Sequence, residues 1–253
     1  MEIRRSADRE FTRLDWLVSR SSFSGAASFD PRFGHPRNTH HGLLVTHNED
    51  TVAAGWGFDT HRHRNMEIVT WVLSGSVVHV DDRGHTALIT PGQAQRMTAG
   101  TGILHSERNN AWQHDPSIPR HDIDAHVVQM WVVPDAAGVP PSYAQTDVTT
   151  ALATGELVPI VSGLPRHRDA ALRLQNQYAG LSIARLGTAG AAVSLPDAAY
   201  VHLFVARGAV EVDGAGRLDQ GDALRLTGIG GHRVSALEAA EILVWEMMRT
   251  VAL

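Results

Sequence analysis

From residue 51 onward the chain alternates short strand-like runs with turn residues, and this pattern restricts the fold more than any other feature. The first four runs are Glu67–Leu73, Ser76–Val80, Thr86–Thr90 and Gln93–Met97. Ser-Gly, Asp-Asp-Arg-Gly and Pro-Gly segments separate them, and these residues favour tight turns. Many short strands with frequent turns indicate an all-β barrel or sandwich and argue against a βαβ fold.

Further strands are predicted on both sides of this stretch. Upstream, Leu43–Thr46 is a strand candidate, and the polar run Asn48-Glu49-Asp50 is the predicted turn after it. Asp30-Pro31 and His35-Pro36 mark turns nearer the N-terminus. Downstream, strands resume at Leu157–Val161, Leu181–Leu186 and Ala191–Leu195.

The two halves of the chain resemble each other, which indicates two barrels built alike. Residues 71–77 (WVLSGSV) align with residues 204–210 (FVARGAV), and residues 92–98 align with residues 221–227. Pro134, Gly138, Pro140 and Pro141 lie between the halves and are typical of a linker. We therefore predict an N-terminal barrel over 1–133, a linker over 134–147 and a C-terminal barrel over 148–253.

Two pairs of metal-ligating side chains bracket the first strands. His61 and His63 are spaced i, i+2, and so are His105 and Glu107. Side chains at i and i+2 of a strand point to the same face, so each pair can converge on one point. One such pair means little among 15 histidines, but two pairs flanking turn-rich strands predict a three-histidine, one-carboxylate site inside the barrel.

The spacing from Gly55 through His61 and His63 to Gly75 resembles the first cupin motif, with one extra residue before the last glycine. The run from Gly102 through His105 to Asn109 resembles the end of the second. More narrowly, the stretch from Phe58 to Asn109, including residues 66–70 (MEIVT) and 95–102 (QRMTAGTG), resembles the pirin family. The resemblance implies an all-β fold of two tandem cupin barrels (double-stranded β-helices, or jelly rolls) with a metal in the N-terminal barrel only.

This chain departs from the usual pirin pattern near the site. Arg62 stands where pirins usually have Pro, and Asn65 where they usually have Asp. These changes leave the candidate ligands intact. They put in doubt the shape and charge of the pocket mouth, and hence the substrate.

The resemblance also implies which glutamate is the fourth ligand. Many cupins use the glutamate of the first motif, Glu67 here, whereas pirins use the residue equivalent to Glu107. Strand geometry agrees, because Glu67 lies about 13 Å beyond His63 along an extended chain. We expect Glu67 to support the ligands from behind or to hold the fold.

The internal repeat predicts that the C-terminal barrel holds no metal. The positions that correspond to the four ligands are Ser194, Pro196, Val234 and Ala236, none of which is a good ligand. His202 and His232 lie nearby in the sequence and do not restore the pattern.

Imidazoles with one carboxylate suit one divalent transition metal. Fe(II) is the expected ion, and Mn, Co, Ni, Cu and Zn are alternatives. Four protein ligands leave a coordination position open, which is typical of a catalytic site, and Glu107 is positioned to act also as a base. Gly57, Phe58, Met66, Met97 and Trp131 are the candidate wall of an aromatic pocket, the alternative for each being that it fills the barrel.

Other residues near the predicted site receive simpler assignments. Trp16 is expected in the core more than at a pocket mouth. Most of the remaining histidines near the site are expected at the surface: His79, His85, His114, His121 and His126.

Two functions from different classes fit these residues. Several pirins resemble quercetin 2,3-dioxygenases, which implies a small aromatic substrate and O2. Other pirins act through a protein partner as redox-responsive regulators of transcription or of a metabolic enzyme. A third hypothesis is that the metal stabilises the barrel and performs no chemistry.

Composition restricts the partners and the location. The net charge of −5 without a basic cluster disfavours direct nucleic-acid binding. There is no run of 18 apolar residues for a membrane span. The chain also has no cysteine, and its first residues are charged without an apolar signal core. We expect a cytoplasmic protein.

Overall fold

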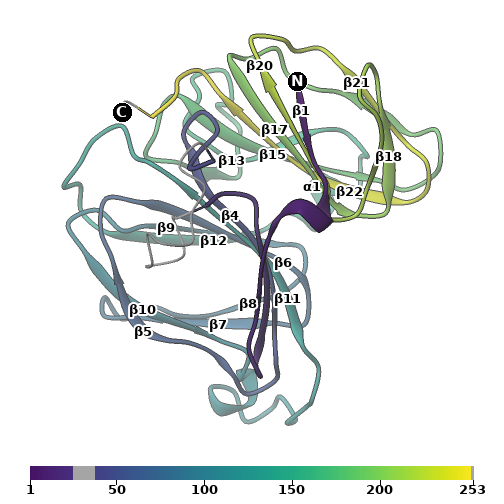
Figure 1. Ribbon diagram of the computed structural model, residues 1–253. Helices are drawn as coiled ribbons and strands as arrows, with labels where there is room; N and C mark the ends of the chain where they lie inside the picture. Colours follow the sequence, from purple (N-terminus) through teal and green to yellow (C-terminus); the bar gives the residue numbers. More distant parts are fainter. Residues whose placement is uncertain (25–37, 252–253) are drawn as a thin grey trace.

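The computed structural model describes residues 1–24 and 38–251, and its regular structure is almost entirely β-strand. These residues form two barrels, each with one sheet of seven described strands and one of four. The prediction of two tandem cupin barrels is confirmed, and Figure 1 shows the N-terminal barrel in blue and teal and the C-terminal barrel in green and yellow. The turns predicted at Asp30-Pro31 and His35-Pro36 lie outside the described residues.

The N-terminal barrel places the candidate ligands in its smaller sheet. That sheet has the order β5-β10-β7-β8, with β5 at Gly57–His63, β7 at Val77–Asp81, β8 at Thr86–Ile89 and β10 at Ile103–Arg108. The larger sheet has the order β12-β9-β6-β11-β4-β3-β2. Its strands are β2 (Glu10–Arg13), β3 (Leu17–Ser21), β4 (Leu44–Val52), β6 (Glu67–Ser74), β9 (Gln93–Thr98), β11 (Ala125–Val132) and β12 (Ser142–Asp147).

The C-terminal barrel repeats this arrangement. Its larger sheet, in the order β1-β20-β17-β22-β15-β13-β14, consists of β1 (Glu2–Arg4), β13 (Val158–Ser162), β14 (Leu172–Arg173), β15 (Ala179–Leu186), β17 (Tyr200–Arg207), β20 (Ala223–Thr227) and β22 (Ala240–Met247). Its smaller sheet, in the order β16-β21-β18-β19, consists of β16 (Ala192–Ser194), β18 (Ala209–Val212), β19 (Gly216–Asp219) and β21 (Arg233–Ala236).

Over residues 1–24 and 38–251, helical structure is confined to short turns. These are the 3-10 helices η1 (Ser6–Asp8) and η2 (Ala111–Gln113) and the single-turn helix α1 (Thr149–Leu152). Within the described part of the chain, none of the helices has the length and apolar character that crossing a membrane requires.

Two strands pair outside the segments to which the predicted domain boundaries assign them. β12 lies inside the predicted linker, yet it pairs with β9 of the N-terminal barrel. β1 lies at the N-terminus but pairs with β20 of the C-terminal barrel, beside the yellow strands in Figure 1. The prolines and the glycine on which the linker prediction was based all lie in the connection between β11 and β12.

The predicted turn at Asn48-Glu49-Asp50 is wrong. These residues lie in the middle of β4, which pairs with β3 on one side and β11 on the other. A strand can carry polar residues there because Glu49 is paired with Arg9 and His126, while Asn48 and Asp50 line a pocket inside the N-terminal barrel. Sequence patterns that assign polar runs to turns miss this case.

The largest apolar cluster lies between the two barrels and not inside either one. It joins Val69, Trp71 and Met130 of the N-terminal barrel to Phe204 and Trp245 of the C-terminal barrel. The Trp71 indole Nε1 donates a hydrogen bond to Glu241 Oε1 at 2.7 Å across this interface. A second large cluster fills the interior of the C-terminal barrel, whereas the clusters inside the N-terminal barrel are small.

Candidate metal centre

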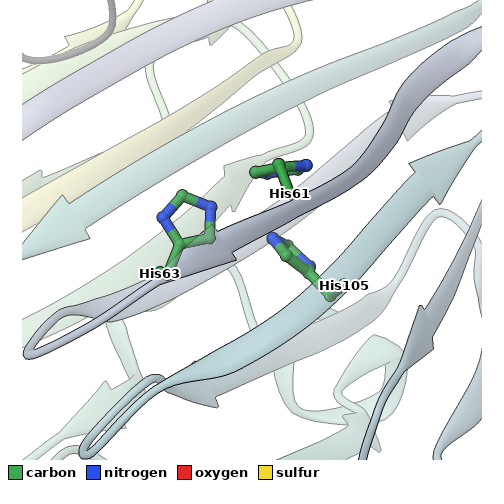
Figure 2. Close-up of side chains that lie close together, drawn as sticks. All are labelled: His61, His63 and His105. Carbon is green, nitrogen blue, oxygen red and sulfur yellow. The ribbon is translucent and has the colours of Figure 1, made fainter.

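Antiparallel pairing of β5 with β10 brings three histidines together. His105 lies opposite His61 in the register, and His63 lies opposite Ile103. The imidazole centroids are 4.5 Å apart for His61 and His105, 4.8 Å for His61 and His63, and 4.9 Å for His63 and His105. One nitrogen of each ring lies within 4.8 Å of the others, and Figure 2 shows the three rings around a common space.

Gly57 permits the close approach of these two strands. A Cβ atom built on Gly57 would lie 2.2 Å from the Glu107 carbonyl oxygen and 2.5 Å from the Arg108 Cα. Both contacts are with backbone atoms, which cannot move away without separating β5 from β10. The residue at this position therefore has to be glycine for the histidines to converge.

The three rings present free nitrogens to the space between them. His61 Nδ1 lies 2.7 Å from the Asp59 carbonyl oxygen, an acceptor, so Nδ1 carries the proton and Nε2 has the lone pair. His63 Nε2 and His105 Nε2 are buried and have no hydrogen-bond partner among the described residues. Burial is the largest effect that lowers the pKa values of His63 and His105 to about 4, so both are neutral at pH 7. Neutral imidazoles with unpaired Nε2 atoms fit a divalent transition metal.

A chain of hydrogen bonds holds His105 from behind. Its Nδ1 lies 3.3 Å from His79 Nδ1, and His79 Nε2 lies 3.3 Å from Asp81 Oδ2. Because the carboxylate only accepts, His79 donates from Nε2, and the tautomer with that proton accepts at Nδ1, so His105 donates from Nδ1. This assignment leaves His105 Nε2 free as a ligand. His85 donates a further bond to Asp81 Oδ2 at 2.8 Å.

His79 belongs to the group of histidines of which most were expected at the surface. The structure instead buries it fully. It lies opposite Glu107 in the pairing of β7 with β10. The available signal was its i, i+2 spacing from Asp81, but the sequence analysis ended this strand at Val80 and assigned Asp81 to the turn, whereas β7 includes Asp81. That spacing places both side chains on the inner face.

Glu107 lies at the side of the three-histidine group. Its carboxylate groups with His79 and His105, and it accepts hydrogen bonds from Gln129 Nε2 at 2.7 Å and Thr70 Oγ1 at 3.3 Å. A bulge in β10 between His105 and Glu107 shifts the register, so Glu107 lies opposite Phe58. Burial opposes its ionisation, but His105, His79 and Gln129 outweigh burial and hold the pKa of Glu107 below its usual value.

Glu67 has a structural place. It is fully buried and accepts hydrogen bonds from Thr98 Oγ1 at 3.0 Å and from the Gln175 backbone N–H at 3.1 Å. Gln175 belongs to the C-terminal half, so this carboxylate joins the two halves.

A cavity of about 340 Å³ opens beside the histidines. Of the predicted pocket residues, Gly57, Phe58 and Trp131 line it, together with His61 and His63. Met97 is instead fully buried in a small core cluster with Ile68, Ala99 and Ile103. Met66 packs against this cluster.

The cavity wall contains residues that the sequence interpretation missed: Trp16, Asn48, Asp50, Asp59 and Gln129. Trp16, expected in the core, meets Phe58 edge to face at 5.3 Å between ring centroids. Trp131 Nε1 donates to Gln129 Oε1 at 2.9 Å, which leaves the Gln129 amide nitrogen for Glu107. The pocket therefore combines aromatic walls with a polar floor.

Both halves of the chain are similar to known proteins. Residues 4–132 match the family model described as pirin, and residues 160–247 match the one described as quercetinase C-terminal cupin domain. A Mycobacterium tuberculosis protein, named provisionally as a quercetin 2,3-dioxygenase, is 49% identical over 98% of this chain and 95% of its own length. An Escherichia coli protein named quercetin 2,3-dioxygenase is 37% identical over 56% of each chain.

Solved structures of a bacterial pirin are similar to this chain over almost its whole length. The crystal structure of YhhW from E. coli has a TM-score of 0.83 at 28% identity, covering 100% of this chain and 99% of its own. The nickel(II) complex of bacterial pirin YhhW has a TM-score of 0.81 at 29% identity and covers 99% of both chains.

Proposed function

The chain belongs to the pirin family, and from this we propose that it is a metal-dependent dioxygenase that cleaves a flavonol or a related hydroxylated aromatic compound with O2. One observation carries the proposal. Three imidazoles with free Nε2 atoms meet at the edge of an aromatic-walled cavity of about 340 Å³, a volume within the usual range for small-molecule sites. The names of the mycobacterial and E. coli relatives support the reaction class.

The residues have distinct proposed roles. His61, His63 and His105 hold the metal, with Glu107 as the fourth ligand. Glu107 also accepts the proton from the substrate hydroxyl that binds beside it, and Gln129 keeps its carboxylate oriented. The aromatic rings of the substrate are enclosed by Gly57, Phe58, Trp16 and Trp131.

Fe(II) is the proposed metal, with Mn, Co, Ni, Cu and Zn as alternatives. The nickel complex of the E. coli relative shows that a pirin of this fold binds a divalent ion. When bound, a redox-active ion supplies the one-electron chemistry that reaction with O2 requires. The proposed location is the cytoplasm.

Aerobic quercetin consumption by the Fe(II)-loaded protein, followed by flavonol absorbance, tests the proposal. We expect turnover that requires the metal and falls by at least about 100-fold in Glu107→Ala. Protein loaded in turn with Mn, Co, Ni and Cu covers the other redox-active metals. No flavonol loss with any metal bound at one per chain contradicts the proposal and favours the redox-responsive regulator, which predicts no turnover.

A further inference from the structure

The floor of the metal-site cavity is formed by the central strands of the larger sheet. Asn48 and Asp50 are spaced i, i+2 on β4 and both line the cavity, as does Gln129 on the adjacent strand β11, opposite Asn48 in the register. The histidines line the same cavity from β5. A molecule filling the cavity therefore contacts the metal ligands and this polar floor together.

Among the described residues, the buried carboxylate of Asp50 has no charged partner, and its hydrogen bond within the chain comes from the neutral Ser19 side chain. The residue is 6% exposed, and its Oδ1 has no hydrogen-bond partner among the described residues. Arg9, the nearby cation, directs its guanidinium to Glu49 Oε2 at 2.7 Å and to the carbonyl oxygens of Arg20 and Gly221. An unpaired buried carboxylate oxygen is unfavourable for folding, so the position calls for a partner from outside the chain.

Glu49, the adjacent residue, shows how the fold treats a structural carboxylate. Its side chain points to the opposite face of β4 and is paired with Arg9 at 2.7 Å and His126 at 3.0 Å. The two neighbouring carboxylates therefore differ in one respect. Glu49 is satisfied by the protein, whereas Asp50 faces the cavity.

Asn48 supplies a complementary group. Its Oδ1 accepts a hydrogen bond from Ser21 Oγ at 2.7 Å, which fixes the orientation of the amide. The amide nitrogen is then the atom that can donate to a bound molecule. A hydroxyl group can donate to a carboxylate and accept from an amide nitrogen at once, whereas an apolar group satisfies neither.

We propose that Asp50 accepts a hydrogen bond from a substrate hydroxyl remote from the oxygen that binds at the metal, so that the site selects polyhydroxylated aromatic compounds. This inference rests on the proposed function and identifies its substrate class. A site built to bond a substrate hydroxyl rejects an analogue that lacks it, because the protein group is then left buried and unpaired.

A trapped water molecule is the competing explanation. A recess of about 20 Å³, lined by Asp50, Glu107 and Gln129 among others, is large enough for one water. If that water alone satisfies Asp50, changing Asp50 alters stability and leaves ligand selectivity intact.

The test measures binding without turnover. Zn(II)-loaded protein is titrated under argon with quercetin and with 3-hydroxyflavone, which keeps only the hydroxyl beside the ketone, and Kd is obtained from quenching of tryptophan fluorescence. The variants are Asp50→Ala, Asp50→Asn and, as the matched control, Glu49→Gln. Thermal unfolding of each variant is measured alongside.

For the wild type we expect quercetin to bind at least about tenfold more tightly than 3-hydroxyflavone. Asp50→Ala weakens quercetin binding about tenfold to 100-fold and leaves 3-hydroxyflavone unchanged, with Asp50→Asn intermediate. Its Tm stays equal or rises, because an unpaired buried charge is removed. Glu49→Gln lowers the Tm and keeps the selectivity.

Two results overturn the inference in different ways. Unchanged quercetin affinity in Asp50→Ala refutes the role of Asp50 and leaves the proposed function standing. A metal-loaded wild type that binds neither flavonol refutes the proposed function and the inference with it.

Discussion

His79 provides the sharpest test of how the metal site is held. Replacing it with Phe keeps a ring of similar size against Tyr143, whose ring centroid lies 4.8 Å away, and removes the acceptor for His105 Nδ1. The His105 N–H is then buried without its partner, 1% of that residue being exposed. We expect weaker metal binding with little change in the packing of β7.

The magnitude follows from the hydrogen bond that is lost. An unsatisfied buried donor costs about 1–3 kcal/mol, and removing a group that orients a ligating histidine weakens metal binding about tenfold to 100-fold. These two figures agree, because 1.4 kcal/mol corresponds to a factor of about ten. The effect includes the loss of tautomer control, since His105 in His79→Phe is free to carry its proton on Nε2.

The assay is competition for Zn(II) or Ni(II) between the protein and a chromophoric chelator at pH 7.5. His85→Phe is the matched control, because His85 donates to the same Asp81 but is partly exposed, whereas the hydrogen-bond partner of His105 is His79. We expect His85→Phe to stay within about threefold of the wild type. Equal metal affinity in His79→Phe and the wild type, with both folded, refutes the orienting role.

Two other predictions concern the remaining histidines. His61→Ala and His105→Ala should abolish stoichiometric metal binding, whereas His202→Ala and His232→Ala should keep one metal per chain; elemental analysis of the purified variants decides this, and a loss on changing His202 or His232 would contradict a single site. Burial, reinforced by the charge of Arg9, lowers the pKa of His47 to about 3, below its unfolded value of about 6.5. The folded state therefore binds fewer protons between about pH 3 and 6.5, so stability is full above that window and falls by up to about 1.4 kcal/mol per pH unit as the pH drops through it. His47→Phe should flatten this slope in urea unfolding, and an unchanged slope would show that other groups cause it.

The sequence predicted the fold and the three histidines because both depend on local periodicity. Strand alternation puts His61 and His63 on one face, and the internal repeat shows that each half is the same kind of barrel. Neither the alternation within a strand nor the repeat depends on which strands are neighbours, whereas the convergence of His105 with His61 does. The register of β5 with β10, which brings His105 opposite His61, was not predicted; the turns between them indicated only that the second pair could fold back over the first.

The errors occurred where a strand lies between two environments. Asn48 and Asp50 are polar because they face a cavity, so their run resembles a turn in the sequence although it lies at the centre of a sheet. Met97 is apolar and on the correct strand, but it faces the core beside the pocket. Which face of a strand meets a cavity depends on the closure of the barrel, and no local pattern encodes that.

The location of the apolar core explains how one barrel can hold such a site. Cavities and unpaired polar atoms destabilise a domain, and the N-terminal barrel carries both in its interior. The C-terminal barrel is filled by apolar side chains, and Val234, which corresponds to a ligand position, is fully buried in that cluster. Because the largest cluster lies between the barrels, the larger sheet of the N-terminal barrel is packed from outside by Trp245 and Phe204. Its inner face is then free to carry Asn48, Asp50 and Gln129, so the second barrel contributes the packing that lets the first keep an open site.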